Sequence, residues 1–181
     1  MGCSDAYRRC DIDLFDAERD TFPYPDEYFE LVLACELLEH LKVDPMHMLF
    51  EIHRVLECDG RLLITTPNCA STASLEQALW RTANPYTYAL YPSPEKSDRG
   101  EAASHIREYT PDELRKLVES AGFQVEFLFT RPGRHVETRD VIEDMLLRYG
   151  FPAELRGERI YCLARKAPGI VRVRFPKFLY G

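Results

Sequence analysis

Residues 28–68 read YFELVLACELLEHLKVDPMHMLFEIHRVLECDGRLLITTPN, and this stretch decides the fold class. The apolar run at 28–34 is typical of a strand buried on both faces, and the run at 61–66 is typical of a second strand. Between them, apolar residues recur at helical spacing after the Asp-Pro pair at 44–45, which favours a helix start, and the Asp-Gly pair at 59–60 is expected to end that helix. A strand, a helix and a second strand in this order predict a parallel pair with a right-handed crossover.

The segments on either side of this unit continue the alternation of strands and helices. Upstream, the sequence predicts a short strand at 10–15. Downstream, Thr110 and Glu113 form a capping box that opens a helix, and Gly122 ends it. The remaining predicted elements are helices at 71–81 and 139–148, a Tyr- and Pro-rich loop at 84–109, and strands at 124–130 and 159–166. The alternation favours an α/β fold.

Composition and charge narrow the class of function. The chain has 181 residues, enough for one domain, and its 23 basic and 30 acidic residues give a net charge of −7. This charge disfavours general binding to nucleic acid. No apolar run approaches the roughly 18 residues that cross a bilayer, and no signal peptide is apparent, so we expect a cytoplasmic protein that does not insert into membranes. The six cysteines include no CxxC pair and therefore predict neither a disulfide framework nor a zinc site.

The charges are unevenly distributed along the chain. Residues 159–181 carry six basic residues and no acidic one. The basic tail at 167–181 is therefore a candidate contact for a phosphate, a membrane surface or an acidic partner, or else a solvated end without a ligand.

Four segments together resemble the class I S-adenosylmethionine-dependent methyltransferases, especially those that act on small molecules. They are FDAERDTFPYPDEYFELVLACELLEHL at 15–41, EIHRVLECDGRLLITTPN at 51–68, HIREYTPDELRKLVESAGF at 105–123 and ERIYCLARK at 158–166. The resemblance implies a partial Rossmann-like methyltransferase fold, in which a parallel sheet ends in an antiparallel hairpin and the first two strands are missing. It implies one domain over 1–181, with a cofactor-side core at 10–68, a substrate loop at 84–109, the C-terminal part of the sheet at 110–166 and the basic tail at 167–181.

The same resemblance implies which residues meet S-adenosylmethionine. Asp16 corresponds to the carboxylate that accepts the adenine amino group, and Ala17 to the residue whose backbone N–H faces the ring. An alternative role for Asp16 is that of a turn or cap residue. Cys35 and Glu36 lie where the methionine end of the cofactor meets the methyl acceptor, at the carboxyl end of a parallel strand.

The histidines are the candidates for the chemistry. His40 and His105 are predicted as catalytic bases, because an acceptor hydroxyl must lose its proton during attack on the sulfonium methyl. The pattern Glu36-x-x-Glu39-His40 resembles one that is associated with a divalent metal in ubiquinone-type O-methyltransferases, and these three residues share one face of a helical turn. The acidic residues are equally explained by a helix N-terminus, and the histidines by packing. A cluster of tyrosines is predicted to wall the substrate pocket: Tyr86, Tyr88, Tyr91 and Tyr109.

Two departures from the family pattern bear on function. None of the nine glycines forms the GxG of the cofactor loop, so the predicted cofactor site is incomplete. Without the first two strands, the strand at 28–34 is expected to have an exposed edge, which a homo-oligomer, a strand swap or a partner chain would cover. The residues after that strand are Ala34-Cys35-Glu36-Leu37 instead of an N-P-P-Y motif, which favours a small-molecule acceptor over a nucleobase.

The function predicted from the sequence is therefore S-adenosylmethionine-dependent methylation of a small molecule, such as a sugar, a quinone-like compound or another biosynthetic intermediate, with oxygen as the acceptor atom. The alternatives are a non-catalytic methyltransferase-like binding or assembly subunit, and one half of a split enzyme.

Overall fold

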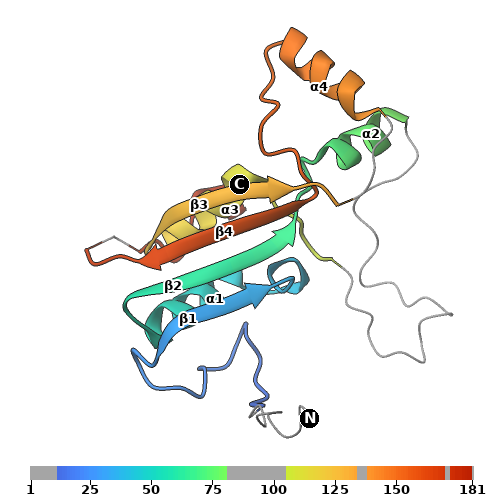
Figure 1. Ribbon diagram of the computed structural model, residues 1–181. Coiled ribbons are helices and arrows are strands. Elements are labelled where there is room, and N and C mark those ends of the chain that lie inside the picture. Colours follow the sequence, from blue (N-terminus) through green and yellow to red (C-terminus); the bar gives the residue numbers. More distant parts are fainter. Residues whose placement is uncertain (1–11, 81–104, 134–137, 170–171, 181) are drawn as a thin grey trace, which may run out of the picture.

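The computed structural model describes residues 12–80, 105–133, 138–169 and 172–180. Four strands form one sheet in the order β1-β2-β4-β3 (Figure 1). The elements, in chain order, are β1 (Phe29–Cys35), the 3-10 helix η1 (Leu38–His40), α1 (Pro45–Val55), β2 (Leu56–Pro67), α2 (Thr72–Trp80), α3 (Pro111–Ser120), β3 (Phe123–Arg131), α4 (Arg139–Arg148), β4 (Arg159–Lys166) and α5 (Lys177–Tyr180).

The predicted strand-helix-strand unit is confirmed, because β1 and β2 are parallel and α1 connects them. Asp44 caps α1 by accepting a hydrogen bond from the backbone N–H of His47 at 3.1 Å. The helix ends at Val55, four residues before the predicted stop. The Asp-Gly pair at 59–60 instead turns the chain within β2, where Asp59 has a positive φ of 63°. The Asp-Gly pair lies at an irregularity in the register between β1 and β2.

The last two strands form the predicted antiparallel hairpin, and β4 inserts between β2 and β3 with both neighbours antiparallel to it. The predicted bounds of β4 and α4 agree with the structure. The capping box is also present: the Thr110 hydroxyl accepts from the Glu113 N–H at 3.2 Å, and the Glu113 carboxylate accepts from the Thr110 N–H at 3.0 Å. Sequence and structure therefore agree best where a local motif fixes the element.

Two predictions about the N-terminal part are wrong. Residues 12–15 form no strand; Phe15 instead packs its ring 4.6 Å from that of Phe22. The strand at 28–34 was expected to be buried on both faces, yet Leu31 and Leu33 of β1 are 51% and 60% exposed. Among the described residues β1 pairs only with β2, so the described sheet has the expected exposed edge beside β1. Leu31 and Leu33 are exposed for a different reason, because their side chains point to a face that no described helix covers.

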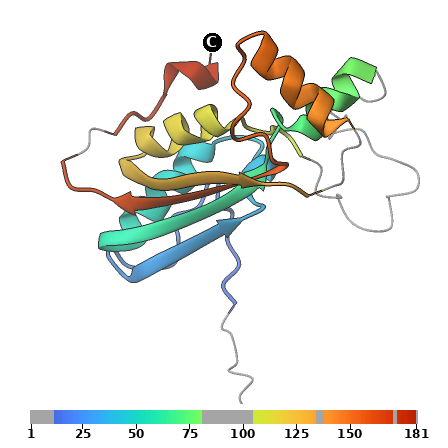
Figure 2. The same cartoon turned by 45° about the horizontal axis from the view of Figure 1, so that its top comes forward.

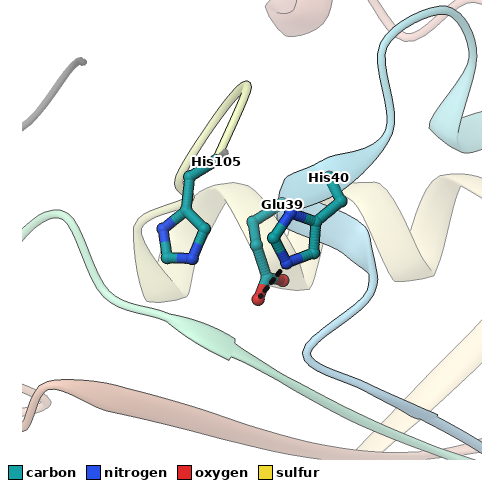
Figure 3. Close-up of side chains that lie close together, drawn as sticks. All are labelled: Glu39, His40 and His105. Atoms are coloured by element: carbon teal, nitrogen blue, oxygen red, sulfur yellow. Dashed lines mark ion pairs between the residues drawn. The ribbon is translucent and has the colours of Figure 1, made fainter. Parts of the chain in front are cut away.

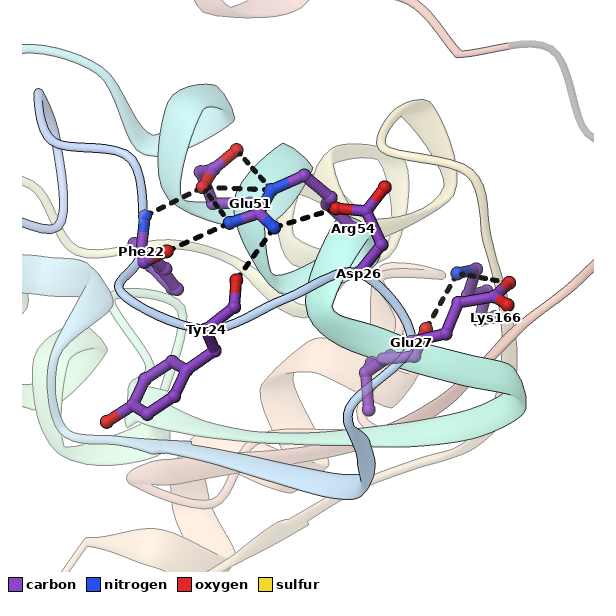
Figure 4. A network of polar contacts seen from close by, with 8 residues as sticks. Phe22, Tyr24, Asp26, Glu27, Glu51, Arg54 and Lys166 are labelled. Carbon is purple, nitrogen blue, oxygen red and sulfur yellow. Dashed lines mark hydrogen bonds and ion pairs between the residues drawn. The ribbon is translucent and has the colours of Figure 1, made fainter.

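Residues 20–28, which lead into β1, are fastened to α1 by one arginine (Figure 4). The Arg54 guanidinium donates to the carbonyls of Phe22 and Tyr24 at 3.0 and 2.9 Å, and it pairs with Glu51 at 2.7 Å and Asp26 at 2.8 Å. Hydrogen bonds to Glu51 and then Asp26 raise the pKa of Arg54. The segment is thus held by charge-assisted bonds in place of a strand ladder.

The helices α1 and α3 lie on one face of the sheet, and their apolar residues form the core with the strand residues that point toward them (Figure 2). No described helix covers the opposite face. The helices α2 and α4 lie beyond one end of the strands, where the Thr138 hydroxyl donates to Glu76. The sheet therefore has one covered and one bare face in the part of the chain that the structure describes.

The described part of the basic tail packs back onto α1. Arg174 forms an ion pair with Asp44, and the Arg172 guanidinium lies 5.4 Å from the ring centre of Phe50. The backbone N–H of Val173 donates to the carbonyl of Ser120 at 2.8 Å. These contacts give the described tail residues a structural role. The sequence analysis had considered only a ligand contact or a solvated end for this tail.

Candidate functional site

The candidate site lies at the carboxyl end of β1, where the chain leaves the sheet through Glu36. This residue has a positive φ of 51°, and its backbone N–H donates to the Thr65 carbonyl at 2.8 Å. Its carboxylate accepts from the Thr65 hydroxyl at 2.9 Å and pairs with Arg159 at 3.1 Å. Glu36 is thereby directed toward β2 and β4, whereas Cys35 beside it is exposed.

Glu39, in η1, is the buried acid of the site. It is 1% exposed, and its Oε2 accepts from the Thr66 hydroxyl at 2.9 Å. Its Oε1 has no hydrogen-bond partner among the described residues, and the Nε2 atom of His40 lies 3.8 Å from it. A buried carboxylate oxygen without a partner is costly, so this atom is a candidate to bind a proton, a cation or a ligand.

Two histidines from distant parts of the sequence meet beside this acid (Figure 3). The rings of His40 and His105 are 5.1 Å apart and inclined by 69°. His105 Nδ1 lies 2.7 Å from Glu108 Oε1, which orients the ring. The backbone N–H of Ile106 donates to the Glu39 carbonyl at 2.7 Å and so holds the His105 segment against η1.

Glu39, His40 and His105 therefore form a three-residue cluster, with one ligand atom from each lying within 4.8 Å of the others. The predicted metal set was Glu36, Glu39 and His40. The structure brings Glu39 and His40 together, places Glu36 in the separate pair with Arg159, and puts His105 in the third position. One carboxylate and two imidazoles can serve as proton acceptors or hold a divalent cation.

The residues predicted to meet adenine lie in a turn. The Asp16 carboxylate accepts from the Glu18 N–H at 2.8 Å and pairs with Arg19 at 3.1 Å. Ala17 is half-buried against the core. This geometry is that of the turn residue that was the alternative for Asp16, and its contact with adenine stays a prediction.

The tyrosine cluster is only partly described. Tyr86, Tyr88 and Tyr91 lie outside the described residues, as does most of the predicted substrate loop. Tyr109 is almost fully buried beside α3, and burial raises its pKa to about 12. It therefore belongs to the core and does not wall an open pocket.

Two partners at the site escaped the sequence analysis. Glu108 lies three residues after His105, so the sequence shows an acid near a predicted base. Its contact with the His105 ring, however, depends on the path of the backbone. Arg159 begins β4 and reaches Glu36 only because β4 lies next to β2. No local pattern marks that contact.

The residues present fit only one side of a cofactor site. Cys35, Glu36 and the three-residue cluster gather at the carboxyl end of β1, where a ligand binds in open α/β sheets. The chain has no GxG turn to approach a cofactor closely, and the described sheet has no strand beyond β1. The described residues therefore fit part of an S-adenosylmethionine site.

The strand order and the antiparallel last hairpin are those of a Rossmann-like methyltransferase fold. The chain belongs to the methyltransferase domain family, whose model matches residues 5–128, more than half of the chain. The family uses S-adenosylmethionine as its methyl donor. No curated protein matches the sequence.

Solved structures resemble the fold at low sequence identity. An S-adenosylmethionine-dependent methyltransferase from Thermotoga maritima is 18% identical with a TM-score of 0.52, and the match covers 83% of this chain and 61% of that one. One from Methanosarcina mazei is 16% identical with a TM-score of 0.53, covering 86% and 66%. The cyclase SpnF, 18% identical with a TM-score of 0.50 and coverages of 87% and 56%, has the same fold, so the fold alone does not fix the reaction. The chain spans less than two thirds of the length of each. Among the described helices, none is long and apolar enough to cross a membrane.

Proposed function

We propose that the chain forms the acceptor side of a cytoplasmic methyltransferase that methylates an oxygen atom of a small molecule, such as a sugar, a quinone-like compound or another biosynthetic intermediate. The observation that supports it is the buried Glu39 carboxylate beside His40 and His105 at the carboxyl end of β1. The net charge of −7 favours a small acceptor over nucleic acid.

In this proposal one of the two histidines takes the proton of the acceptor hydroxyl and becomes an imidazolium. S-adenosylmethionine, when bound, supplies an electrophilic methyl group. His105 is the better placed base, because its Nδ1 is oriented by Glu108 and its Nε2 is left to receive a proton. Glu39 stabilises the positive charge that develops on His40.

The cofactor contacts proposed for this chain are those of Asp16, Ala17, Cys35 and Glu36. In this proposal a segment outside residues 1–181 supplies the glycine-rich turn. If the cofactor does not bind, the chain is better explained as a non-catalytic assembly subunit or as one half of a split enzyme.

A titration tests the cofactor proposal. We expect S-adenosylhomocysteine to bind the wild-type chain in calorimetry and to bind Asp16→Ala at least about tenfold more weakly, since a carboxylate bond to a ligand amine contributes about 1.5–3 kcal/mol. Asp140→Ala, on the surface of α4, is the matched control and should bind like the wild type. Absence of heat with the wild-type chain would favour the assembly subunit.

A divalent cation at the same cluster is a second candidate, favoured by the Glu39 Oε1 atom that has no hydrogen-bond partner among the described residues. Bound there, a cation would orient an acceptor oxygen and lower the pKa of its hydroxyl. The residues that would hold it are Glu39, His40 and His105. Imidazole and carboxylate donors suit zinc, manganese or iron better than calcium.

The cation is tested by calorimetry with Zn²⁺ and Mn²⁺ on the chain without other ligands. Glu39→Gln keeps the shape and removes the charge, so it should abolish binding, whereas Glu36→Gln lies outside the cluster and should leave binding unchanged. Equal binding by all three proteins would assign the cation to another place on the surface. Because this readout does not need the methyl donor, it is independent of the cofactor test.

A further inference from the structure

The Glu18 carboxylate binds a row of backbone donors between η1 and α1. Its Oε2 accepts from the N–H of Lys42 at 3.0 Å, and its Oε1 accepts from those of Val43 and Asp44 at 2.5 and 2.7 Å. Successive backbone N–H groups that converge in this way form a concave site that favours an anion. We call residues 42–44 the backbone nest. Hydrogen bonds to an ionised carboxylate are about twice as strong as those to a neutral acceptor, so Glu18 is a strong anchor for the nest.

Asp44, the neighbouring acid, has a different set of partners. Its side chain accepts from the His47 N–H inside α1 and pairs with Arg174 of the tail. Glu18 instead accepts from the N–H groups that precede the helix, including that of Asp44 itself. Because the two acids serve separate donors, Asp44 cannot replace Glu18 without giving up the cap of α1.

Glu18 belongs to the turn at 16–20, which carries the residues proposed to meet the cofactor. The Asp16 carbonyl accepts from the Asp20 N–H at 2.9 Å, and the Asp16 carboxylate accepts from the Glu18 N–H at 2.8 Å. The Nε2 atom of His47 lies 2.9 Å from the Asp20 carbonyl and fastens the far end of the turn to α1. The backbone of Glu18 is therefore bound within the turn, and its carboxylate is bound outside it.

The backbone nest lies directly after the histidine of η1. Leu41 alone separates His40 from the nest. On the other side of His40, the Glu39 carbonyl accepts from the Ile106 N–H at 2.7 Å. The backbone around His40 is thus fixed from two directions, by Ile106 before it and by Glu18 after it. Loss of either anchor would let the imidazole ring move away from the rest of the cluster.

Electrostatic interactions also place Glu18 near the three-residue cluster. Burial is the main cause of the raised pKa of Tyr109, and the negative charges of Glu18 and Glu39 raise it further. Because such interactions weaken with distance, the two carboxylates lie in the same neighbourhood. The turn and the cluster are therefore neighbours in space as well as being joined through the backbone.

We propose that Glu18 is a positioning residue that joins the turn at 16–20 to the three-residue cluster. Its carboxylate fixes the backbone nest, and this keeps the His40 ring beside Glu39 and His105. Glu18 itself contacts no reacting atom. What the positioned histidine does rests on the methyl-transfer proposal, but the positioning is a property of the chain without ligands.

The first test compares Glu18→Gln with the wild type by NMR in the absence of ligands. The glutamine amide presents a donor to the backbone donors, so amide hydrogen exchange at 42–44 should be at least about tenfold faster. The imidazole signals of His40 and His105 should shift. The signal of His53, whose ring packs against Phe123 on the covered side, should stay in place. His53 thereby separates a loss of positioning from a general loss of stability.

Two further variants complete this test. Glu30→Gln is the matched control, since it removes the same charge from an exposed residue of β1 and should change neither the exchange rates nor the histidine signals. Glu18→Asp keeps the charge on a shorter side chain and should cause smaller changes of the same kind, so it serves even where Glu18→Gln does not fold. Unchanged His40 and His105 signals in the folded Glu18 variants would overturn the proposal, as would an equal shift of His53.

Calorimetry with Zn²⁺ and with S-adenosylhomocysteine separates the positioning from the function. Where the wild-type chain binds these ligands, Glu18→Gln should bind each at least about fivefold more weakly, because the turn and the cluster lose their common anchor. Equal binding by the variant and the wild type would overturn the positioning role. If neither ligand binds the wild type while the histidine signals still shift in Glu18→Gln, the positioning role stands and the methyl-transfer and cation proposals fail.

Discussion

Leu62 and Leu63 are neighbours in β2 with identical side chains, yet they lie in opposite environments. Leu62 is fully buried in the core that α1 and α3 form with the sheet, whereas Leu63 is half-buried on the bare face. Both are apolar, so the sequence alone does not distinguish the two faces of this strand. The comparison shows that an apolar strand pattern indicates which faces of the strand can be buried. It does not show which segment covers each face.

On the covered face, local capping motifs also satisfy the backbone N–H groups at the helix starts. The start of α1 is capped by Asp44 and the start of α3 by the capping box. On the bare face, the charged side chains at the strand ends form ion pairs with one another. Such surface ion pairs contribute little to stability. We therefore expect the folding free energy of the chain to come mainly from one side of the sheet.

The largest expected difference in the free energy of unfolding is that between Leu62→Ala and Leu63→Ala. The first removes a fully buried side chain and should lower the free energy of unfolding by about 2–5 kcal/mol, whereas the second should lower it by about 1 kcal/mol or less. Urea unfolding followed by circular dichroism measures both. Equal losses from the two substitutions would show that the bare face is covered within the chain, contrary to the architecture described above.

A second prediction concerns His53, which lies on the covered side with its ring 5.2 Å from that of Phe123. Burial, and then the positive charges of Lys166 and Arg172, lower the pKa of His53 from 6.5 to about 4. Because the folded state disfavours the protonated ring, the stabilising difference is fully present above pH 6.5 and is lost as the pH falls toward 4. After allowance for solvent screening of this half-buried group, we expect a loss of about 1–2 kcal/mol.

Unfolding curves of the wild type and His53→Gln between pH 7.5 and pH 4 measure this loss. The variant should be less dependent on pH over this range, because its side chain does not titrate. His47→Gln, whose residue lies on the same helix near the surface, is the control and should follow the wild type. An unchanged pH dependence in His53→Gln would show that other groups cause it.

The parts of the fold that were predicted well depend on contacts close in sequence. Thr110 and Glu113 are three residues apart, and the helix and strand bounds that follow them agree with the structure. The strand predicted at 10–15 was wrong in its described part because a strand needs a neighbour, and no strand of the described sheet lies beside residues 12–15. The early end of α1 was missed because the turn at 59–60 is used inside β2, not at the end of the helix.

The sequence analysis chose the residues of the site correctly, but it did not predict which of them lie together. His40, His105 and Glu39 were all chosen from the sequence, but their meeting depends on the backbone bonds that bring residues 105–107 to η1. Glu36 was grouped with Glu39 by helical spacing. The structure has only one short 3-10 turn there, and the Arg159 side chain from β4 draws Glu36 away.

The smallest expected effect is that of Thr110→Ala, which removes one half of the capping box on the covered face. It should lower the free energy of unfolding by about 1 kcal/mol, whereas Thr110→Ser keeps the hydroxyl and should cost less than half of that. Lys116→Ala, on the exposed side of α3, is the control and should cost nothing. Because Glu113 also pairs with Arg107 at 2.9 Å, loss of the cap should loosen the segment that carries His105 and weaken metal binding slightly. A variant that bound metal like the wild type would show that the cap and the His105 segment are not energetically coupled.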